Sequence, residues 1–362
     1  MVITMKLTVK VKLLPTSDQK SSLLKTMEVF NNACNYISKI AWETKTFGHV
    51  GLHHLCYKFV RETYGLSAQL TVRAIGKVCE SYRIDKKTLH VFKKYSALVY
   101  DQRILSFRGL DTVSILSLDG RFKIPIVCGE YAQLHRRLIR GQSDMIYVKG
   151  NLFLCLCVEV PDGTPIEPKG TIGIDFGICN LATNSDGDNF SGKEVDAVRE
   201  RTTTIKKKLQ KRGSKSAKRH LKKLSGKEAR FKRNTNHIIS KKIVSKAKDT
   251  SRSISLEDLK GFNGRRTVRK AERERFGKWA FNQLRSFIEY KAKLAGVLMI
   301  AVDPRNTSRT CSVCGCISKR NRKSQAIFSC IDCGTTLNAD HNAAKNIALR
   351  AAVNPPIAVY AV

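Results

Sequence analysis

Two Cys-x-x-Cys pairs near the end of the chain constrain its folding more than any other feature. The pairs are Cys311-Ser-Val-Cys314 and Cys330-Ile-Asp-Cys333, and a glycine follows each of them. Glycine permits the tight turn that leaves both sulfur atoms of a pair on one side of the backbone. Four thiolates at this spacing suit a tetrahedral Zn²⁺ ion in a closed, structural site. The pattern therefore predicts a zinc ribbon over residues 307–337.

The other eight of the 12 cysteines are scattered, and most of them stand among apolar neighbours. Disulfide bonds are rare in long intracellular chains, so we interpret these residues as small core side chains. Cys316 needs separate weighing, because it lies two residues beyond Cys314 and could replace it as a ligand. It breaks the symmetry of the two pairs, and we therefore expect it to be a bystander.

The net charge restricts the class of partner. Lys and Arg number 66 against 30 Asp and Glu, which gives +36 at pH 7 and a pI near 10.0. A protein this basic attracts polyanions, and nucleic acid is the usual one. No stretch approaches the roughly 20 apolar residues that span a bilayer, and the first 14 residues do not resemble a signal peptide. We expect an intracellular nucleic-acid-binding protein without a membrane partner.

The first 168 residues predict a small β-barrel that a helical segment interrupts. Residues 6–14 alternate between Lys and apolar side chains, as an opening strand does. Ser17 or Asp18 then stands where a helix cap is expected. The domains that we expect are a wedge-like β-barrel over residues 1–16 and 97–168 and a helical recognition lobe over residues 17–96.

Individual elements of this half follow from periodicity and turn residues. Helical spacing predicts helices over residues 18–46, 52–63 and 68–82. Alternating runs predict strands over residues 104–107, 112–118, 121–126, 145–149 and 152–160, with hairpin turns at Asp119-Gly120 and Gly150-Asn151. Residues 161–170, rich in Pro and Gly, are interpreted as a linker.

Three acidic residues follow or open apolar elements in the second half. Asp175 ends an apolar run, where a lone charge is costly unless it binds a metal or pairs with a cation. Glu257 ends a second apolar run, although it could be a surface acid with Asp258 as a rival. Asp340 opens a helix over residues 339–352, where it could instead stabilise the helix N-terminus.

Residues 195–250 are strongly basic and predict helices, which Gly213-Ser214 and Ser225-Gly226 could punctuate. A charged face of mixed sign is usually solvated, whereas this face is nearly all positive and indicates contact with a polyanion. The candidate nucleic-acid contacts are Lys206, Lys207, Lys208, Lys211, Arg212 and, in a separate segment, Arg309. A core-packing helix over residues 270–294 and a buried strand over residues 296–302 are expected to follow.

Together these strings resemble the TnpB family, transposon-associated nucleases related to type V CRISPR effectors. The resemblance is carried by Gly173-Ile-Asp-Phe-Gly177, Ser255-Leu-Glu-Asp-Leu259, Val302-Asp-Pro-Arg-Asn-Thr-Ser308, the two cysteine pairs, and Asn338-Ala-Asp-His-Asn-Ala-Ala-Lys-Asn346. Their order and spacing match over residues 170–350, and the first 170 residues match only in general layout. The extra Cys316 is a mild departure.

The resemblance implies an RNase H-like (RuvC) domain over residues 169–306 and 338–352, with the zinc ribbon inserted and residues 353–362 as a tail. It assigns Asp175, Glu257 and Asp340 to a catalytic triad that holds Mg²⁺ or Mn²⁺. Asp303, Asn306 and Arg309 would support this site or the substrate. The fold class expected is thus α/β plus β. The resemblance also implies a protein of the prokaryotic cytoplasm, associated with the nucleoid.

The function that the resemblance implies is RNA-guided cleavage of double-stranded DNA next to a short adjacent motif, with a guide RNA as partner. Specificity would come from base pairing between guide and target, and cleavage from two-metal hydrolysis of a phosphodiester. Three alternatives remain at this point. They are an RNA-guided repressor that does not cut, a transposase proper, and a non-enzymatic zinc-ribbon protein that binds nucleic acid.

Overall fold

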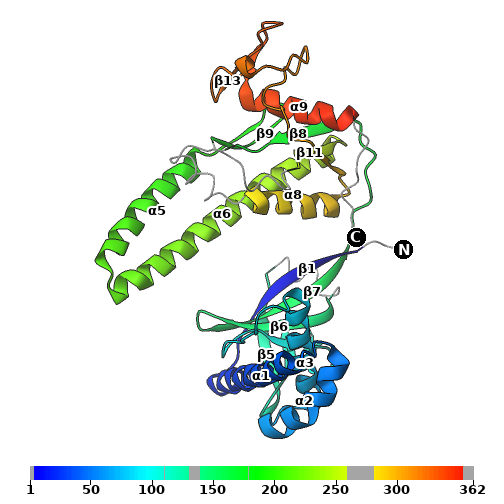
Figure 1. The fold of residues 1–362 in the computed structure, drawn as a ribbon, viewed down its shortest axis with the longest axis vertical. Helices are drawn as coiled ribbons and strands as arrows, with labels where there is room; N and C mark the ends of the chain where they lie inside the picture. The colour runs from blue at the N-terminus through cyan, green and yellow to red at the C-terminus, as the bar shows by residue number, and fades with distance from the viewer. Residues whose placement is uncertain (1–3, 110, 130–138, 178, 259–280, 354–362) are drawn as a thin grey trace. The chain divides into compact units, whose positions relative to one another are not determined.

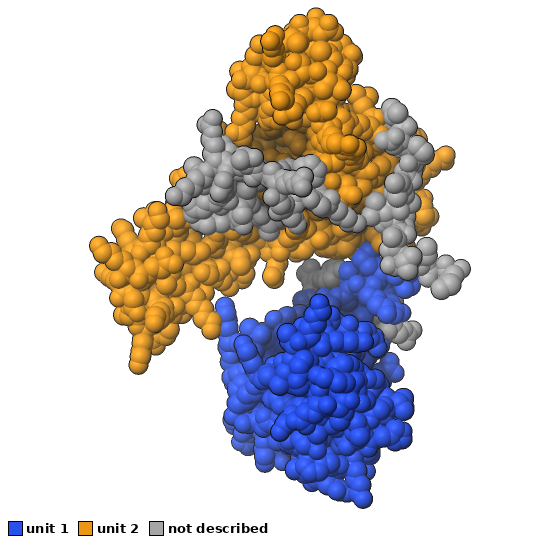
Figure 2. All heavy atoms as spheres, viewed as in Figure 1, with its two compact units in different colours: residues 1–161 blue, residues 162–362 orange. Residues whose placement is uncertain are grey.

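The computed structural model describes residues 4–109, 111–129, 139–177, 179–258 and 281–353. The chain divides into two compact units, Met1–Pro161 and Asp162–Val362, shown in different colours in Figure 2. The finer division into five domains that the sequence suggests stays a prediction. No helix in the described ranges is long and apolar enough to cross a membrane.

Three helices make up the first part of the first unit. They are α1 (Ser17–Thr44), α2 (His49–Tyr64) and α3 (Ala68–Ile84), close to the ranges expected from helical spacing. The cap of α1 was wrongly predicted. Thr16 accepts a hydrogen bond from the backbone N–H of Gln19, whose side chain accepts one from the N–H of Thr16. This reciprocal pairing satisfies two otherwise unpaired donors, which Ser17 or Asp18 in the first turn does not do.

Seven strands form one sheet in the first unit, in the order β2-β6-β7-β1-β5-β4-β3 (Figure 1). Their bounds are β1 (Thr4–Leu13), β2 (Leu98–Tyr100), β3 (Leu105–Arg108), β4 (Thr112–Ser117), β5 (Gly120–Val127), β6 (Ile139–Val148) and β7 (Asn151–Pro161). The three-residue strand β2 was not expected. Lys149 and Gly150 both have positive φ, as a two-residue hairpin turn between β6 and β7 requires. In the described residues the pairing order ends at β2 and β3, so a closed barrel stays a prediction.

A five-stranded sheet is the centre of the second unit, in the order β10-β9-β8-β11-β12. The strands are β8 (Thr171–Asp175), β9 (Asn180–Asn184), β10 (Asn189–Ser191), β11 (Ser253–Glu257) and β12 (Met299–Val302). Strands β8, β11 and β12 are parallel, and β9 and β10 extend the sheet as antiparallel strands. The helices are α5 (Lys193–Arg212), α6 (Lys215–Asp249), α8 (Phe281–Ala295) and α9 (Ala339–Val353). The expected α/β character is therefore present.

Helices cover both faces of this sheet (Figure 1). Ile172 and Leu256 point into a core that α6 and α8 complete with Ile243 and Ile288. The alternate residues point to the other face, where Ser255 donates a hydrogen bond to the backbone of α9. We call this second side of the sheet the α9 face.

The basic segment folds as two helices, α5 and α6. Gly213 ends α5 in the left-handed conformation, and Ser214 caps α6 by accepting from the N–H of Ala217, as the sequence suggests. The expected break at Ser225-Gly226 is wrong, because α6 runs through it. One glycine inside a helix costs only about 1 kcal/mol, which a 35-residue helix tolerates. The expected helix over 270–294 is seen as α8, and its first 11 predicted residues lie outside the described ranges.

Candidate functional site

Two of the three predicted acids end neighbouring parallel strands. Asp175 is the last residue of β8, and Glu257 is the last residue of β11. The register pairs Leu256 with Ile174, so Asp175 and Glu257 come next on strands spaced about 4.8 Å apart. Because side chains alternate along a strand, both carboxylates point toward the α9 face.

The third acid, Asp340, stands on that same face in the first turn of α9. Its side chain is 14% exposed, and its Oδ2 accepts a hydrogen bond of 3.0 Å from the side-chain amide of Asn180 on β9. The same oxygen lies 3.8 Å from the position that a Cβ on Gly177 would take. The Asp340 carboxylate therefore packs against the backbone just after Asp175.

The start of α9 is fixed by its own cap and by the neighbouring segment. Asn338 accepts hydrogen bonds from the N–H groups of Asp340 and His341, which an N-cap asparagine does. The buried amides of Asn342 and Asn346 donate to the carbonyl of Thr310, at 2.8 and 2.7 Å. The asparagines of this motif thus fasten α9 to the chain that leads into the cysteine-rich module.

Glu257 is held from two sides. The Thr307 hydroxyl donates to its Oε1 at 2.5 Å, and Arg285 of α8 donates to its backbone carbonyl at 2.8 Å. The rival acid, Asp258, is the next residue, and its side chain is 42% exposed with the Arg285 guanidinium 3.9 Å away. Alternation turns Glu257 and Asp258 to opposite sides, so only Glu257 shares the α9 face with Asp175.

The supporting role expected of Asp303, Asn306 and Arg309, in the segment after β12, stays a prediction. Asp303 forms an exposed ion pair with Arg305, and Asn306 takes a positive φ of 63° in a turn. Arg309 is exposed. The residue of this segment that reaches a carboxylate is Thr307, which the sequence analysis did not single out. Thr307 lies in a loop between Pro304 and Cys311, where no helix or strand periodicity predicts which side chain is functional. Its contact with Glu257 in the folded chain identifies it.

A cation from the cysteine-rich module reaches the same place. The Arg322 guanidinium lies 3.9 Å from Oδ1 of Asp340, and its side chain is 34% exposed. Arg322 also donates to the carbonyl of Gln325, which keeps the arginine oriented. The sequence analysis did not include Arg322 among the candidate site residues.

The three carboxylates do not form a ready-made cage for one ion. Among the described residues, the group of three or more Cys, His, Asp or Glu side chains close enough to share an ion is the four cysteines. A two-ion site distributes its ligands over cations about 3.5–4 Å apart, so it does not require that approach. The donors gathered here are carboxylate, amide and hydroxyl oxygens on one face of the sheet, and the carboxylates suit Mg²⁺.

The four cysteines of the two pairs meet in one cluster, with all sulfur atoms within 4.8 Å of one another. The Cys311 and Cys333 sulfurs are 3.7 Å apart, and those of Cys314 and Cys330 are 3.5 Å apart. A tetrahedral Zn–S bond of about 2.3 Å requires sulfur separations of about 3.8 Å. The cluster therefore fits a structural zinc ion. The module also contains η2 (Lys319–Asn321), β13 (Ile327–Ser329) and β14 (Thr336–Asn338).

Local hydrogen bonds favour the thiolate form, which zinc requires, at one cysteine of the cluster. The hydroxyl and the N–H of Thr335 hydrogen bond to the Cys333 sulfur and lower the pKa of Cys333 to about 6. Gly315 and Gly334 take positive φ values of 77° and 71° directly after each pair. Cys316 is not a member of the cluster and packs beside it, while its carbonyl accepts from Asn321.

The candidate nucleic-acid contacts on α5 are of two kinds. The Lys206 ammonium pairs with Glu228 of α6 at 2.5 Å, and Glu228 also pairs with Lys232 at 3.1 Å. Lys206 therefore stabilises the α5–α6 hairpin. The other predicted cations of this helix are exposed, namely Lys207, Lys208, Lys211 and Arg212.

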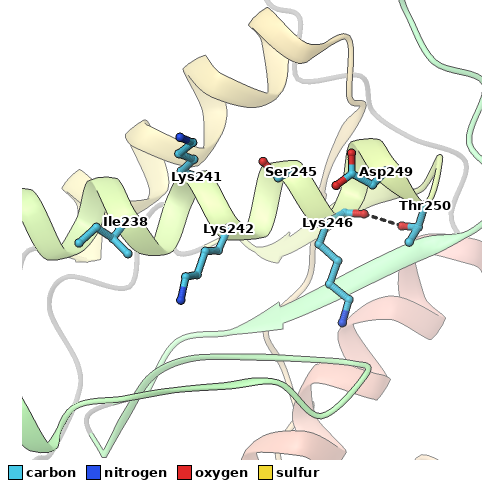
Figure 3. A pocket seen from close by; sticks show the side chains of 7 residues that line it. All are labelled: Ile238, Lys241, Lys242, Ser245, Lys246, Asp249 and Thr250. Atoms are coloured by element: carbon cyan, nitrogen blue, oxygen red, sulfur yellow. Dashed lines mark hydrogen bonds between the residues drawn. The ribbon is translucent and has the colours of Figure 1, made fainter.

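A groove of about 560 Å³ follows the second half of α6 (Figure 3). Its lining residues recur as one helical face, namely Ile238, Lys241, Lys242, Ser245, Lys246, Asp249 and Thr250. The end of α6 leads into the amino end of β11, whereas Glu257 stands at the carboxyl end. The groove is thus separate from the carboxylates. Lys241 and Lys242 are exposed and make it attractive to anions, whereas Lys246 pairs with Asp186 and Asp188.

Close backbone packing at Gly173 sets the position of α9, which gives a first prediction. A Cβ at residue 173 would overlap the carbonyl of Ala344 and lie 2.5 Å from the N atom of Ala348. Backbone atoms of a helix cannot move aside locally, so we expect Gly173→Ala to lower the free energy of unfolding by about 3 kcal/mol. Gly76→Ala is the control, because Gly76 has nothing within 4 Å of its Cβ position.

Thermal or urea unfolding of the two variants measures this difference. Gly76 lies inside α3, so alanine there should raise stability by about 0.5–1 kcal/mol. Equal stability of Gly173→Ala and the wild type would mean that α9 does not rest on the β8 backbone.

Two family models match the chain. Residues 155–260 match a model described as a probable transposase, and residues 281–347 match one described as the Cas12f1-like TNB domain. A TnpB-like protein of Methanocaldococcus jannaschii is 36% identical over 263 residues, which cover 67% of this chain and 92% of that protein. The chain belongs to the TnpB-like family. The resemblance indicated by the sequence motifs is thus confirmed.

This TnpB-like chain also matches parts of longer relatives. A CRISPR-associated endodeoxyribonuclease Cas12f1 of Sulfoacidibacillus thermotolerans is 42% identical over 127 residues, which cover 35% of this chain and 29% of the relative. Two other Cas12f relatives are covered over 45% and 38% of their length. The matched part of the TnpB-like chain thus corresponds to less than half of these proteins.

The fold of the TnpB-like chain has a solved counterpart. The protein in a cryo-EM structure of a Cas12f1–sgRNA–target DNA complex superposes with a TM-score of 0.64 at 16% identity. The superposition covers 93% of this chain and 83% of that one. At this identity the likeness shows a shared fold, and it extends over nearly all of the TnpB-like chain.

Proposed function

We propose that this protein is an RNA-guided DNA endonuclease that cleaves double-stranded DNA next to a short adjacent motif, and that it is associated with a transposable element. One observation carries the proposal. Asp175 and Glu257 end adjacent parallel strands on the α9 face, and the first turn of α9 brings Asp340 to the same face. Three carboxylates from three distant segments on one face of a sheet are the arrangement that metal-dependent phosphodiester hydrolysis uses.

Asp175, Glu257 and Asp340 would hold two Mg²⁺ or Mn²⁺ ions. When bound, the ions supply an activated water and stabilise the leaving oxygen of the phosphodiester. The hydroxyl of Thr307 orients the Glu257 carboxylate, and the amide of Asn180 orients that of Asp340. Outer contacts of this kind fix ligand geometry and tune affinity.

Arg322 has a distinct role in this proposal. Its guanidinium lies 3.9 Å from Asp340 and compensates the charge of that carboxylate, and it would also contact a phosphate that enters the site. Arginine binds phosphate oxygens in a planar, bidentate way. The cysteine-rich module, with its zinc ion, would therefore supply one cation to the nuclease site.

The remaining parts of the chain bind nucleic acid in this proposal. The exposed lysines of α5 and the basic groove on α6 neutralise phosphates of the guide RNA and of its duplex with the target strand. Residues 1–16 and 97–168 form the wedge-like barrel, residues 17–96 form the recognition lobe, and residues 169–306 with 338–352 form the RNase H-like domain. Target sequence is read by base pairing with the guide.

Charge reversal on α5 tests the nucleic-acid surface. We expect the triple variant Lys207→Glu, Lys208→Glu and Lys211→Glu to bind RNA more weakly. The slope of log K against log salt, which is negative, should become shallower by about 2–3. The matched control is Lys206→Gln, because Lys206 already pairs with Glu228 and should contribute little to the slope. Binding isotherms at several salt concentrations measure both values. An unchanged slope in the triple variant would contradict the assignment.

The decisive experiment purifies the protein from its native locus, sequences the RNA that accompanies it, and incubates the complex with plasmids that carry the matching target. We expect linear DNA with Mg²⁺ and none with EDTA. Binding of the target without cleavage would favour a guide-dependent repressor. Joining of donor ends to a new site would favour a transposase, and either outcome contradicts the proposal.

A further inference from the structure

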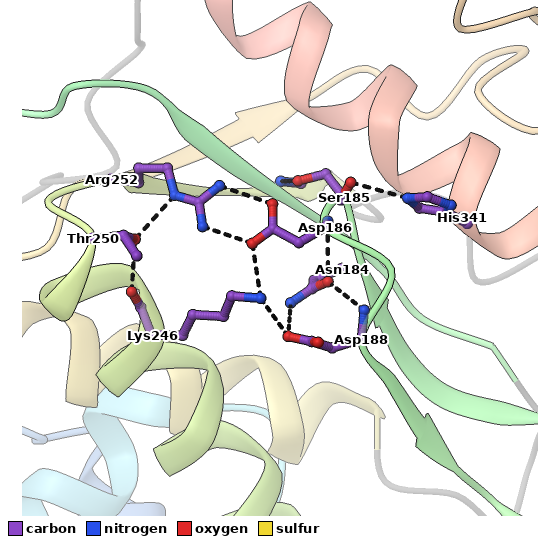
Figure 4. Close-up of polar contacts among 9 residues, drawn as sticks. Asn184, Ser185, Asp186, Asp188, Lys246, Thr250, Arg252 and His341 are labelled. Carbon is purple, nitrogen blue, oxygen red and sulfur yellow. Dashed lines mark hydrogen bonds and ion pairs between the residues drawn. The ribbon is translucent and has the colours of Figure 1, made fainter.

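The turn between β9 and β10, Asn184–Asp188, is tied together by its own polar groups (Figure 4). The buried Asn184 side chain accepts from the N–H groups of Asp186 and Asp188, at 3.1 and 2.8 Å. It also donates to the Asp188 carboxylate at 2.8 Å. Gly187 completes the turn with a φ of +95°. A turn with this many internal bonds holds one shape.

Two cations bind this turn, one from the last turn of α6 and one from the segment that joins α6 to β11. Arg252 donates two parallel hydrogen bonds to Asp186, at 2.8 and 2.6 Å. The Lys246 ammonium lies 2.8 Å from Asp186 and also pairs with Asp188. Bidentate charge-assisted bonds are among the strongest polar contacts in proteins. The Arg252 guanidinium, with Lys246 beside it, keeps the pKa of Asp186 far below its usual range.

On its other side the turn contacts β8 and α9. The N–H of Ser185 donates to the carbonyl of Gly173, and its hydroxyl accepts from the N–H of Gly173. The carbonyl of Ser185 accepts a hydrogen bond of 3.0 Å from Nε2 of His341, the residue after Asp340. Continuous polar contacts therefore lead from Arg252 through the turn to the first turn of α9.

We propose that the Asn184–Asp188 turn, held by Arg252 and Lys246, positions Asp340 through its hydrogen bond with His341. The first turn of a helix frays readily, because its N–H groups have no partners within the helix. Asp340 lies in that turn. His341 binds the turn to Ser185, which is itself hydrogen bonded to Gly173, two residues before the end of β8. Arg252, Lys246, Asp186 and His341 are positioning residues, since they act on the carboxylate through α9. The inference rests on the proposed function in taking Asp340 as a metal ligand.

The test compares His341→Ala with His341→Gln, whose amide restores a donor at a similar distance. The control is Leu349→Ala, because Leu349 is 52% exposed on the same helix. Hydrogen exchange of residues 339–345 and binding of Mn²⁺, followed by electron paramagnetic resonance, are measured on the full chain purified without RNA. We expect His341→Ala to exchange about tenfold faster, as loss of one hydrogen bond predicts. Mn²⁺ affinity should fall about tenfold, the lower bound for an outer contact to a metal ligand.

His341→Gln should recover most of both effects, and Leu349→Ala should show neither. Arg252→Ala should shift exchange and Mn²⁺ affinity in the same direction as His341→Ala. Faster exchange with unchanged Mn²⁺ affinity would overturn the positioning role and leave the metal site intact. Unchanged exchange and affinity would overturn it as well. If Asp340→Asn bound Mn²⁺ as tightly as the wild type, the proposed metal site itself would fail, and the positioning role with it.

Discussion

Asp175→Asn is expected to abolish DNA cleavage while binding of the guide RNA persists. The substitution keeps the size of the side chain and removes its charge, so the strand and its packing should be unchanged. Asp175 ends β8 beside the end of β11, on the face that α9 covers. A neutral amide binds a hard divalent cation far less well than a carboxylate does. We expect the cleavage rate to fall by more than about 100-fold. Loss of a residue that only hydrogen bonds to a metal ligand usually costs less than this.

The neighbourhood of Glu257 provides the matched control for this experiment. Asp258→Asn also neutralises an acid at the end of a strand, but alternation turns Asp258 away from the α9 face, and its side chain is 42% exposed. The Asp258→Asn variant should cleave DNA like the wild type, whereas the Glu257→Gln variant should lose cleavage like Asp175→Asn. Plasmid cleavage over time, with RNA binding measured on the same preparations, gives the comparison. Full activity of Asp175→Asn, or loss of activity in Asp258→Asn, would refute the site assignment.

The second large effect concerns the zinc cluster. Cys330→Ser is expected to reduce bound zinc from one ion per chain to nearly none, because the four sulfurs lie within 4.8 Å of one another, as the ligands of one zinc ion must. A structural zinc ion contributes about 10–16 kcal/mol of binding free energy, much of which supports the fold of a small module. Phe328 and Ala339 pack with Cys311 and Cys330, so the start of α9 depends on the module. Cleavage should therefore fall as well.

Cys316→Ser is the control for this substitution. Cys316 packs beside the cluster without belonging to it, so its replacement should leave the zinc content unchanged. Metal analysis of the purified chains decides between the two, and hydrogen exchange of residues 307–345 reports the loss of structure. Zinc retained by Cys330→Ser, or lost by Cys316→Ser, would mean that the ligand set is wrong.

Features that depend on local order were predictable from the sequence. Helix α1 and strand β7 follow their periodicity closely, because burial of one face repeats every 3.6 or two residues. The two cysteine pairs needed only their spacing and the glycines that follow. The acids at the ends of β8 and β11 stood out because charge is unusual after an apolar run. Membership of the TnpB-like family followed from these strings in their order.

Local choices between similar signals were less predictable. Thr16 caps α1 although Ser17 and Asp18 carry equally good cap side chains, because only Thr16 lies three residues before Gln19. Ser225-Gly226 has the composition of a helix break, yet α6 continues through it. In both cases the outcome depends on a small difference in free energy between two acceptable local structures.

By itself the sequence determined which residue types were available and, to within a few residues, where most of the helices and strands lie. Only the tertiary structure decided which of them meet. The fold brings Asn180, Thr307 and Arg322 into contact with the carboxylates. It also pairs Arg252 with Asp186, 66 positions away in the chain. The physical reason is that periodicity reflects burial of neighbouring residues, whereas a contact between distant segments depends on how strands pair and how α9 packs on the sheet.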